Sequence, residues 1–135
     1  METRNVNIDN RAWGSEIHIA NNEEKKYCGK LLGLREGYRC SIHRHKKDES
    51  LYLAKGIVYF EMGEDPENLD SQIIYPGKVI DVFDKIWHRF SGLENSIFVE
   101  VSTPDEESER YQGKLGGKIP DFENWRNKIL SENGR

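Results

Sequence analysis

The sequence predicts an all-β fold, a sandwich or barrel of short strands, followed by one helix. Eight or nine short segments alternate apolar and polar side chains or are rich in β-branched and aromatic residues, and turn residues separate them at regular intervals. Helical spacing is confined to the end of the chain. A length of 135 residues fits one domain.

The strands are expected, in chain order, at 16–20, 27–34, 38–43, 49–54, 57–62, 72–75, 78–83, 87–91 and 96–102. Residues 1–12 are polar, so they either lie loosely or add an edge strand. The short connections at 35–37 and 55–56 predict that the strands on either side pair as two hairpins, with Gly56 at a positive φ.

The end of the chain has a different character. Residues 104–118 are charged and contain glycines, so a loop is expected there. Apolar residues then recur at helical spacing: Phe122, Trp125 and Ile129. We therefore divide the chain into a barrel at 1–103 and, at 104–135, a charged loop and a C-terminal helix that packs on the outside of the barrel.

Composition excludes several classes of partner. The net charge of −4 and the pI of about 5.6 give no basic footprint for nucleic acid or an anionic membrane. No apolar run approaches the roughly 20 residues that span a bilayer. The N-terminus has no apolar signal core, so we expect a cytoplasmic protein in which both cysteines are free thiols.

The stretch 37–56, GYRCSIHRHKKDESLYLAKG, carries the clearest chemistry. His43 and His45 are two residues apart, so they share one face of a strand. Glu49 follows a short turn and can return to the same point, and His88 offers a fourth ligand. Two surface histidines are the ordinary alternative for such a pair. The glutamate, the flanking glycines and His88 favour a site for one divalent ion of Mn, Fe, Zn, Ni or Co.

This stretch resembles the first motif of the cupin superfamily, Gly-x5-His-x-His-x3-Glu-x6-Gly. The motif is met in full by Gly37, His43, His45, Glu49 and Gly56. The resemblance covers about 27–103 and implies a cupin-type jelly-roll β-barrel, or double-stranded β-helix. It also implies that one divalent metal ion is bound inside the barrel by His43, His45, Glu49 and His88.

The second motif of that superfamily, Gly-x5-Pro-x-Gly-x2-His-x3-Asn, is met in part. Gly77 and His88 stand at the expected spacing. Where the family usually has Pro, Gly and Asn, this sequence has Phe83, Lys85 and Gly92. These departures concern the turn geometry around His88 rather than the ligand itself.

Hairpin register gives an expectation for the cavity lining. If the first hairpin turns at 35–36, the alternation of side chains along its two strands places several residues on the same face as the histidines: Cys28, Lys30, Leu32, Arg39 and Ser41. The opposite face then carries Tyr38, Cys40 and Ile42, which separates the two cysteines and argues against a disulfide. An apolar wall is expected from Leu51, Leu53, Val58 and Phe60, on the face of Glu49.

Four further residues allow two interpretations each. Lys30 and Arg39 either hold an anionic or polyhydroxy ligand or extend to the rim and only solubilise it. Glu100 is either a surface residue or a cavity base with a raised pKa, depending on the length of the preceding turn. His18 is expected on the surface or at a dimer contact.

The motif context also resembles the type II mannose-6-phosphate isomerase and lyxose isomerase kind of cupin, with Trp13-Gly14 and Lys30-Leu31 at matching places. This implies a metal-dependent sugar or sugar-phosphate isomerase or epimerase. The metal would polarise a carbonyl, Glu49 or Glu100 would move the proton, and Lys30 or Arg39 would hold a phosphate or stabilise an enediolate.

Two alternatives stay open at this point. The same four ligands serve Fe(II)-dependent dioxygenases of small organic substrates in other cupins, and a non-enzymatic cupin that binds a metal or a sugar is the third hypothesis. In each case the partner is a small molecule, a sugar or an organic acid. The outward face carrying Tyr38, Cys40 and Ile42 needs a cover, which an N-terminal strand or a second subunit could supply, and we expect a homodimer.

Overall fold

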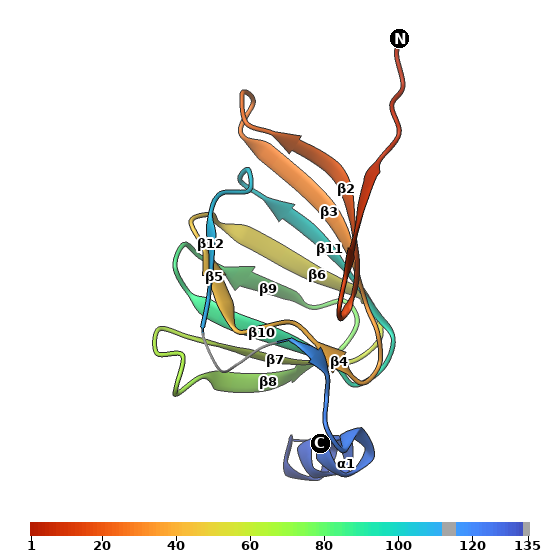
Figure 1. Ribbon diagram of the computed structural model, residues 1–135, viewed down its shortest axis with the longest axis vertical. Helices are drawn as coiled ribbons and strands as arrows, with labels where there is room; N and C mark the ends of the chain where they lie inside the picture. Colours follow the sequence, from red (N-terminus) through yellow and green to blue (C-terminus); the bar gives the residue numbers. More distant parts are fainter. Residues whose placement is uncertain (112–115, 134–135) are drawn as a thin grey trace.

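Two antiparallel sheets face each other in the computed structural model, which describes residues 1–111 and 116–133 (Figure 1). The first sheet has the order β1 (Asn7–Arg11), β2 (Gly14–Asn22), β3 (Tyr27–Leu34), β11 (Ser96–Ser102), β6 (Glu49–Lys55) and β9 (Val79–Val82). The second runs β12 (Ser108–Arg110), β5 (His43–His45), β10 (Trp87–Gly92), β4 (Tyr38–Arg39) and β13 (Gly117–Lys118). On the other side of β10 it continues through β7 (Val58–Gly63) to β8 (Asp70–Ile74). The predicted all-β jelly-roll class is confirmed.

The main core fills the space between the sheets. Along β6, buried and more exposed residues alternate, which turns Leu51 and Leu53 inward. Val58 and Phe60 of β7 join them from the second sheet, and Phe98 of β11 is fully buried. Leu51, Leu53, Val58 and Phe60 therefore face the interior, as their alternation predicted, but they belong to the packed core and do not line the cavity.

A second, smaller core lies under the C-terminal helix, α1 (Phe122–Asn133). Ile129 packs with Ile73 and Leu93, and the Trp125 ring meets Tyr59 edge-on at 5.8 Å between centroids. The helix therefore packs on the outside of the second sheet, as its spacing predicted (Figure 1). No helix in the described part of the chain is long and apolar enough to cross a membrane.

Both expected hairpins are wrong. β3 pairs with β2 and β11, whereas β4 pairs with β10 and β13. β6 and β7 also belong to different sheets, and Gly56, at a φ of +90°, lies where the chain crosses between them. A turn signal shows that the chain reverses, but in a two-sheet fold the reversal often leads to the opposite sheet.

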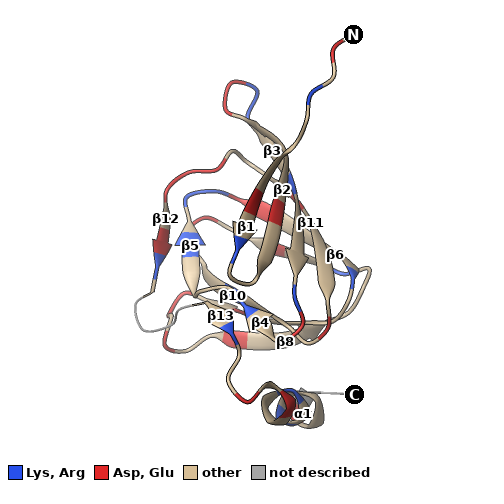
Figure 2. Cartoon of the chain, turned by 45° about the vertical axis from the view of Figure 1, so that its right-hand side comes forward, with Lys and Arg blue, Asp and Glu red and all other residues tan. Residues whose placement is uncertain are grey.

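The expected loop at 104–118 contains two short strands. β12 pairs with β5, and β13 pairs with β4 (Figure 2). Their sequences are charged or glycine-bearing and too short to show periodicity, so the pairing partners decide the structure. Residues 112–115 of that expectation lie outside the described residues. At the other end, β1 provides the edge strand that was one of two expectations.

Candidate metal centre and its cavity

Three histidines converge between the two sheets. β5 carries His43 and His45 on one face, and His88 of β10 is the direct cross-strand partner of His43. The ring centroids are 4.3 Å apart for His43 and His88, 4.8 Å for His43 and His45, and 5.3 Å for His45 and His88. One ring nitrogen from each histidine lies within 4.8 Å of the others, which is close enough for a single ion to contact all three.

Backbone carbonyls orient two of these rings. Nδ1 of His43 donates to the carbonyl of Ser41 at 2.7 Å, and Nδ1 of His88 donates to the carbonyl of Ile86 at 3.0 Å. Because a carbonyl only accepts, Nδ1 carries the proton in each ring and Nε2 keeps its lone pair. Burial, reinforced by the neighbouring histidines, lowers the pKa of all three rings to about 3. Neutral imidazole is the form that binds a metal.

Glu49 lies beside this cluster at the start of β6. Its Oε1 is 3.8 Å from Nε2 of His88, and its Oε2 is 3.3 Å from Nζ of Lys47. Burial, and then the charge of Glu100, raises the pKa of Glu49 to about 7. Three imidazole nitrogens with one adjacent carboxylate form a donor set that fits a divalent transition metal. Glu49 lies on the same side of the histidine cluster as Lys47, with which it forms an ion pair.

Lys47 is the main residue that the sequence did not single out. Its side chain is only 2% exposed, and its Nζ lies 2.9 Å from Oε2 of Glu100 and 2.6 Å from Oδ1 of Asp105. Burial alone would lower the pKa of Lys47, but Glu100 and Glu49 outweigh it and raise that pKa. In the sequence Lys47 belongs to a charged turn, where nothing local distinguishes it from the exposed Lys46.

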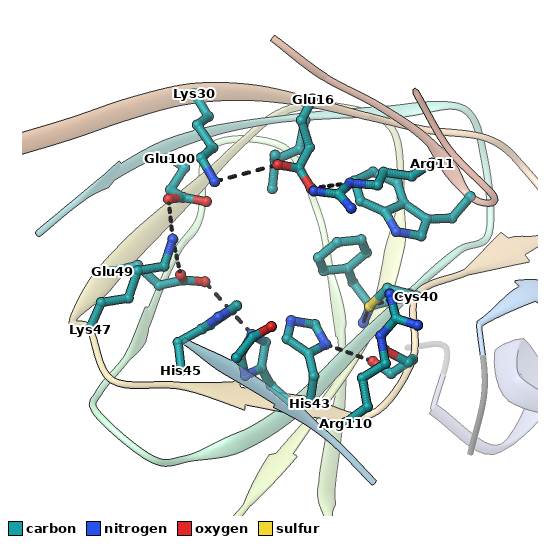
Figure 3. A pocket seen from close by; sticks show the side chains of 16 residues that line it. Arg11, Glu16, Lys30, Cys40, His43, His45, Lys47, Glu49, Glu100 and Arg110 are labelled. Carbon is teal, nitrogen blue, oxygen red and sulfur yellow. Dashed lines mark hydrogen bonds and ion pairs between the residues drawn. The ribbon is translucent and has the colours of Figure 1, made fainter. Parts of the chain in front are cut away.

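Lys30 lines the cavity, as expected, but it is already paired. Its Nζ lies 2.6 Å from Oδ2 of Asp105 and 3.4 Å from Oε1 of Glu16. Glu16 in turn accepts a hydrogen bond from Nε of Arg11 at 2.9 Å. Hydrogen bonds from Lys30 and Lys47 outweigh the burial of Asp105 and lower its pKa to about 2. Asp105 joins these ion pairs into one network by contacting both Lys30 and Lys47. Figure 3 shows two parts of it, Arg11–Glu16–Lys30 and Glu49–Lys47–Glu100.

Glu100 faces the cavity, so it is not a surface residue. It is 3% exposed and accepts hydrogen bonds from Lys47 at 2.9 Å and from the Ser102 hydroxyl at 2.8 Å. His18, by contrast, is not part of the cavity lining; its Nε2 lies 3.1 Å from Oδ2 of Asp9 in the β1–β2 hairpin.

The placement of Arg39 on the cavity face is wrong. Arg39 pairs with Ser91 and Gly117 in the second sheet and is not among the lining residues, whereas Cys40 and Ser41 both are. A bend at Ile42 separates β4 from β5 and breaks the strand alternation on which the expectation depended.

The same bend changes the expectation for the opposite face. Cys40 is turned inward and Ile42 is buried, so neither belongs to an exposed apolar face beside Tyr38. Burial raises the pKa of the Cys40 thiol to about 12. Cys28 is buried as well, and both cysteines are free, as expected.

The cavity above the histidines has a volume of about 140 Å³. Its apolar wall comes from Trp13, Leu32 and Phe90. Apart from the residues that the sequence indicated, its polar lining consists of Arg11, Glu16, Lys47, Ser108 and Arg110. The last two come from β12, which the sequence did not reveal. The cavity therefore combines a candidate metal centre, an ion-pair network and an apolar wall.

Comparison with known proteins supports the fold. No family model and no curated protein matches the sequence. Among solved structures, KdgF from Halomonas sp. covers 69% of this chain and 80% of its own, at 17% identity and a TM-score of 0.58. Oxalate decarboxylase from Bacillus subtilis covers 96% of this chain at 13% identity and a TM-score of 0.63, and this chain spans 37% of it. Tomato vicilin covers 78% at 17% identity and a TM-score of 0.62, and this chain spans 33% of it.

Proposed function

Because this chain has the cupin fold, we propose that it binds one divalent transition-metal ion and isomerises or epimerises a small sugar, sugar phosphate or organic acid. The observation that carries the proposal is the meeting of three neutral histidines, His43, His45 and His88, with Glu49 beside them. The donor set is compatible with Mn, Fe, Zn, Ni or Co. The structurally similar Bacillus subtilis oxalate decarboxylase has Mn(II) centres, so Mn is the first metal to test.

The metal-binding residues in this proposal are His43, His45, His88 and Glu49. The Nδ1 hydrogen bonds of His43 and His88 point their Nε2 atoms away from their own backbone, so these ligands are oriented before an ion arrives. A bound ion would supply Lewis acidity for a substrate carbonyl or hydroxyl oxygen.

Glu100 is the residue that we assign to proton transfer. The hydrogen bonds that it accepts from described residues, from Lys47 and Ser102, both reach Oε2. Its Oε1 is therefore available to take a proton from a substrate carbon and return it to the neighbouring carbon. Lys47 positions this carboxylate, and Lys30 would stabilise the negative charge of an enediolate. Arg39 has no role in this proposal because it does not line the cavity.

Hydrogen exchange tests the proposal directly. The metal-loaded protein, incubated in D2O with aldoses, ketoses and their phosphates, is expected to place deuterium on the carbon next to the carbonyl of its substrate, as measured by NMR. Glu100→Gln should abolish the exchange and keep the metal, while the exposed control Glu64→Gln should behave as wild type. A metal-loaded protein that exchanges no hydrogen with any of them would favour a non-enzymatic binding role.

The apolar wall favours one alternative chemistry. The Phe60 ring stacks on His88 at 6.2 Å with an interplanar angle of 9°, and Trp13 and Phe90 line the cavity. Apolar surface beside the same ligands suits an Fe(II)-dependent dioxygenase of a small organic substrate. Oxygen consumption by the Fe(II)-loaded protein, with no hydrogen exchange on sugars, would select this alternative.

A homodimer remains part of the proposal, on a different surface from the one expected. Five outward residues lie in register across the first sheet: Ile17, Leu31, Val99, Tyr52 and Val79. Tyr52 is 43% and Val79 56% exposed, and a second copy of this face would cover them. Light scattering during size-exclusion chromatography should give twice the chain mass; a monomer at micromolar concentration would contradict it. A cytoplasmic location also stays a prediction.

A further inference from the structure

The short strand β12 turns one exposed arginine toward the edge of the cavity. In the β12–β5 ladder, Arg110 lies opposite His43, and Ser108 lies opposite His45. Residues directly opposite on an antiparallel pair share a face of the sheet. Because the two histidines face the cavity, Arg110 and Ser108 face it too, and both are among its lining residues. Figure 3 shows Arg110 on the side of His43 and Cys40, across the view from Lys47.

The outer face of the same ladder holds this register in place. Glu109 lies opposite Arg44, and Nε and Nη2 of Arg44 donate to Oε2 of Glu109 at 3.0 and 2.7 Å. The Arg44 guanidinium also lies over the Trp87 ring, 4.4 Å from its centroid. A slip of β12 by one residue would lose these contacts and turn Arg110 outward. The contacts therefore fix which side chain of β12 enters the cavity.

Arg110 is the cation of this site that lacks a carboxylate partner. Every acidic residue of the network pairs with a cation other than Arg110, namely Arg11, Lys30 or Lys47. Within the described residues Arg110 forms no ion pair, and the adjoining segment 112–115, Gln-Gly-Lys-Leu, contains no acidic side chain. An unpaired guanidinium at the edge of a small polar cavity is available to a ligand.

We propose that Arg110 binds the oxyanion group, a carboxylate or a phosphate, of an acidic substrate whose other oxygens lie toward the histidines. This inference deepens the proposed function and rests on it. A guanidinium presents two parallel N–H donors, which match two oxygens of either group. The volume of about 140 Å³ is close to that of the ~150 Å³ cavity that holds benzene, so a ligand with a backbone of three or four carbons fits.

Three probes with the same three-carbon backbone test this inference: glycerol, D-glycerate and glycerol 3-phosphate. Their affinities are measured by calorimetry on the Mn-loaded and the metal-free protein. We expect wild type to bind at least one of the two anions about tenfold or more tightly than glycerol. Whether glycerate or glycerol 3-phosphate binds more tightly identifies the anionic group.

Substitutions then assign the preference to Arg110. Arg110→Gln should abolish it, and Arg110→Lys should keep part of it, because a lysine retains the charge but not the paired donors. Arg35→Gln, at an exposed arginine outside the cavity lining, should leave it unchanged. Equal affinity for the three probes, no measurable binding of any of them, or a preference that survives Arg110→Gln would overturn the inference.

Metal content, measured on the same preparations, separates the two proposals. Retention of metal without an anion preference overturns the role of Arg110 and leaves the proposed metal site intact. A wild type that takes up no metal contradicts the proposed function. In that case the affinities of the metal-free protein for the three probes still test the role of Arg110.

Discussion

His43 of β5 and His88 of β10 lie directly opposite each other, with ring centroids 4.3 Å apart, although they belong to distant parts of the sequence. Their Nδ1 atoms donate to backbone carbonyls, so two Nε2 lone pairs lie in the same buried space. Neutral rings packed in this way resist protonation. A divalent cation would bind these lone pairs without adding a proton, so the arrangement favours metal binding.

Lys47 is expected to be essential for the stability of the cavity wall. Lys47→Met keeps most of the side-chain volume but leaves Glu49 and Glu100 buried without their shared cation. Loss of one partner of a buried ion pair costs about 3–5 kcal/mol in the free energy of unfolding. Urea unfolding of the metal-free protein measures this cost. Lys46→Met, at the exposed neighbour, should change stability by less than about 0.5 kcal/mol, and equal effects of the two variants would contradict the network.

The metal-free protein should lose stability as the pH falls from 7 to 5. Each of the three histidines has a folded pKa of about 3, below its unfolded value of about 6.5, so only the unfolded chain takes up these protons. Each therefore lowers the free energy of unfolding by about 1.4 kcal/mol per pH unit below pH 6.5.

Glu49 acts in the opposite direction. Its pKa is about 7 in the folded protein against a usual 4.5. Between these pH values the folded protein keeps a proton on Glu49 that the unfolded chain releases, which cancels the effect of one histidine on the free energy of unfolding. The net fall is then roughly 2–3 kcal/mol per pH unit. Chemical unfolding at several pH values measures it. His88→Gln should flatten the curve; a wild type equally stable at pH 5 and 7 would refute buried neutral histidines.

Gly56 and Gly77 form a matched pair for a backbone test. Both have a positive φ, +90° and +94°. A Cβ at Gly56 would collide with Ser96 and with the carbonyl of Asn95, whereas one at Gly77 would meet nothing within 4 Å. Gly77→Ala should therefore cost only the backbone strain, about 1–2 kcal/mol. Gly56→Ala should add the collision and cost about 2–5 kcal/mol in total. Thermal unfolding that ranks the two variants in reverse would contradict the sheet crossing at Gly56.

The sequence was sufficient to predict most of the longer strands, but not the short strands β12 and β13 and not which strands pair. Alternation along 49–54 and 57–62 correctly turned Leu51, Leu53, Val58 and Phe60 inward, because side-chain direction is a local property of a strand. Which strand lies alongside depends on the whole fold. For this reason both hairpins were wrong, although the turns themselves were placed correctly.

For the site, residues within a recognisable spacing were predictable and residues placed by tertiary contacts were not. His43, His45, Glu49 and His88 were indicated by the motif, and the structure brings them together. Lys47 is buried only because carboxylates from β6, β11 and the following segment surround it. A cavity arginine was expected at Arg39, but the bend at Ile42 turns Arg39 away, and the cavity is lined instead by Arg11 and, from β12, by Arg110.

Metal content decides whether the three histidines and Glu49 bind an ion. It is measured by mass spectrometry on protein purified without added metal and again after reconstitution with Mn, Fe, Co, Ni or Zn. We expect about one ion per chain in the wild type and almost none in a His43→Ala, His45→Ala double variant. His18→Ala removes a histidine outside the cavity and should retain the full content. A reconstituted wild type that holds none of these metals, or a double variant that holds as much as wild type, would contradict the account.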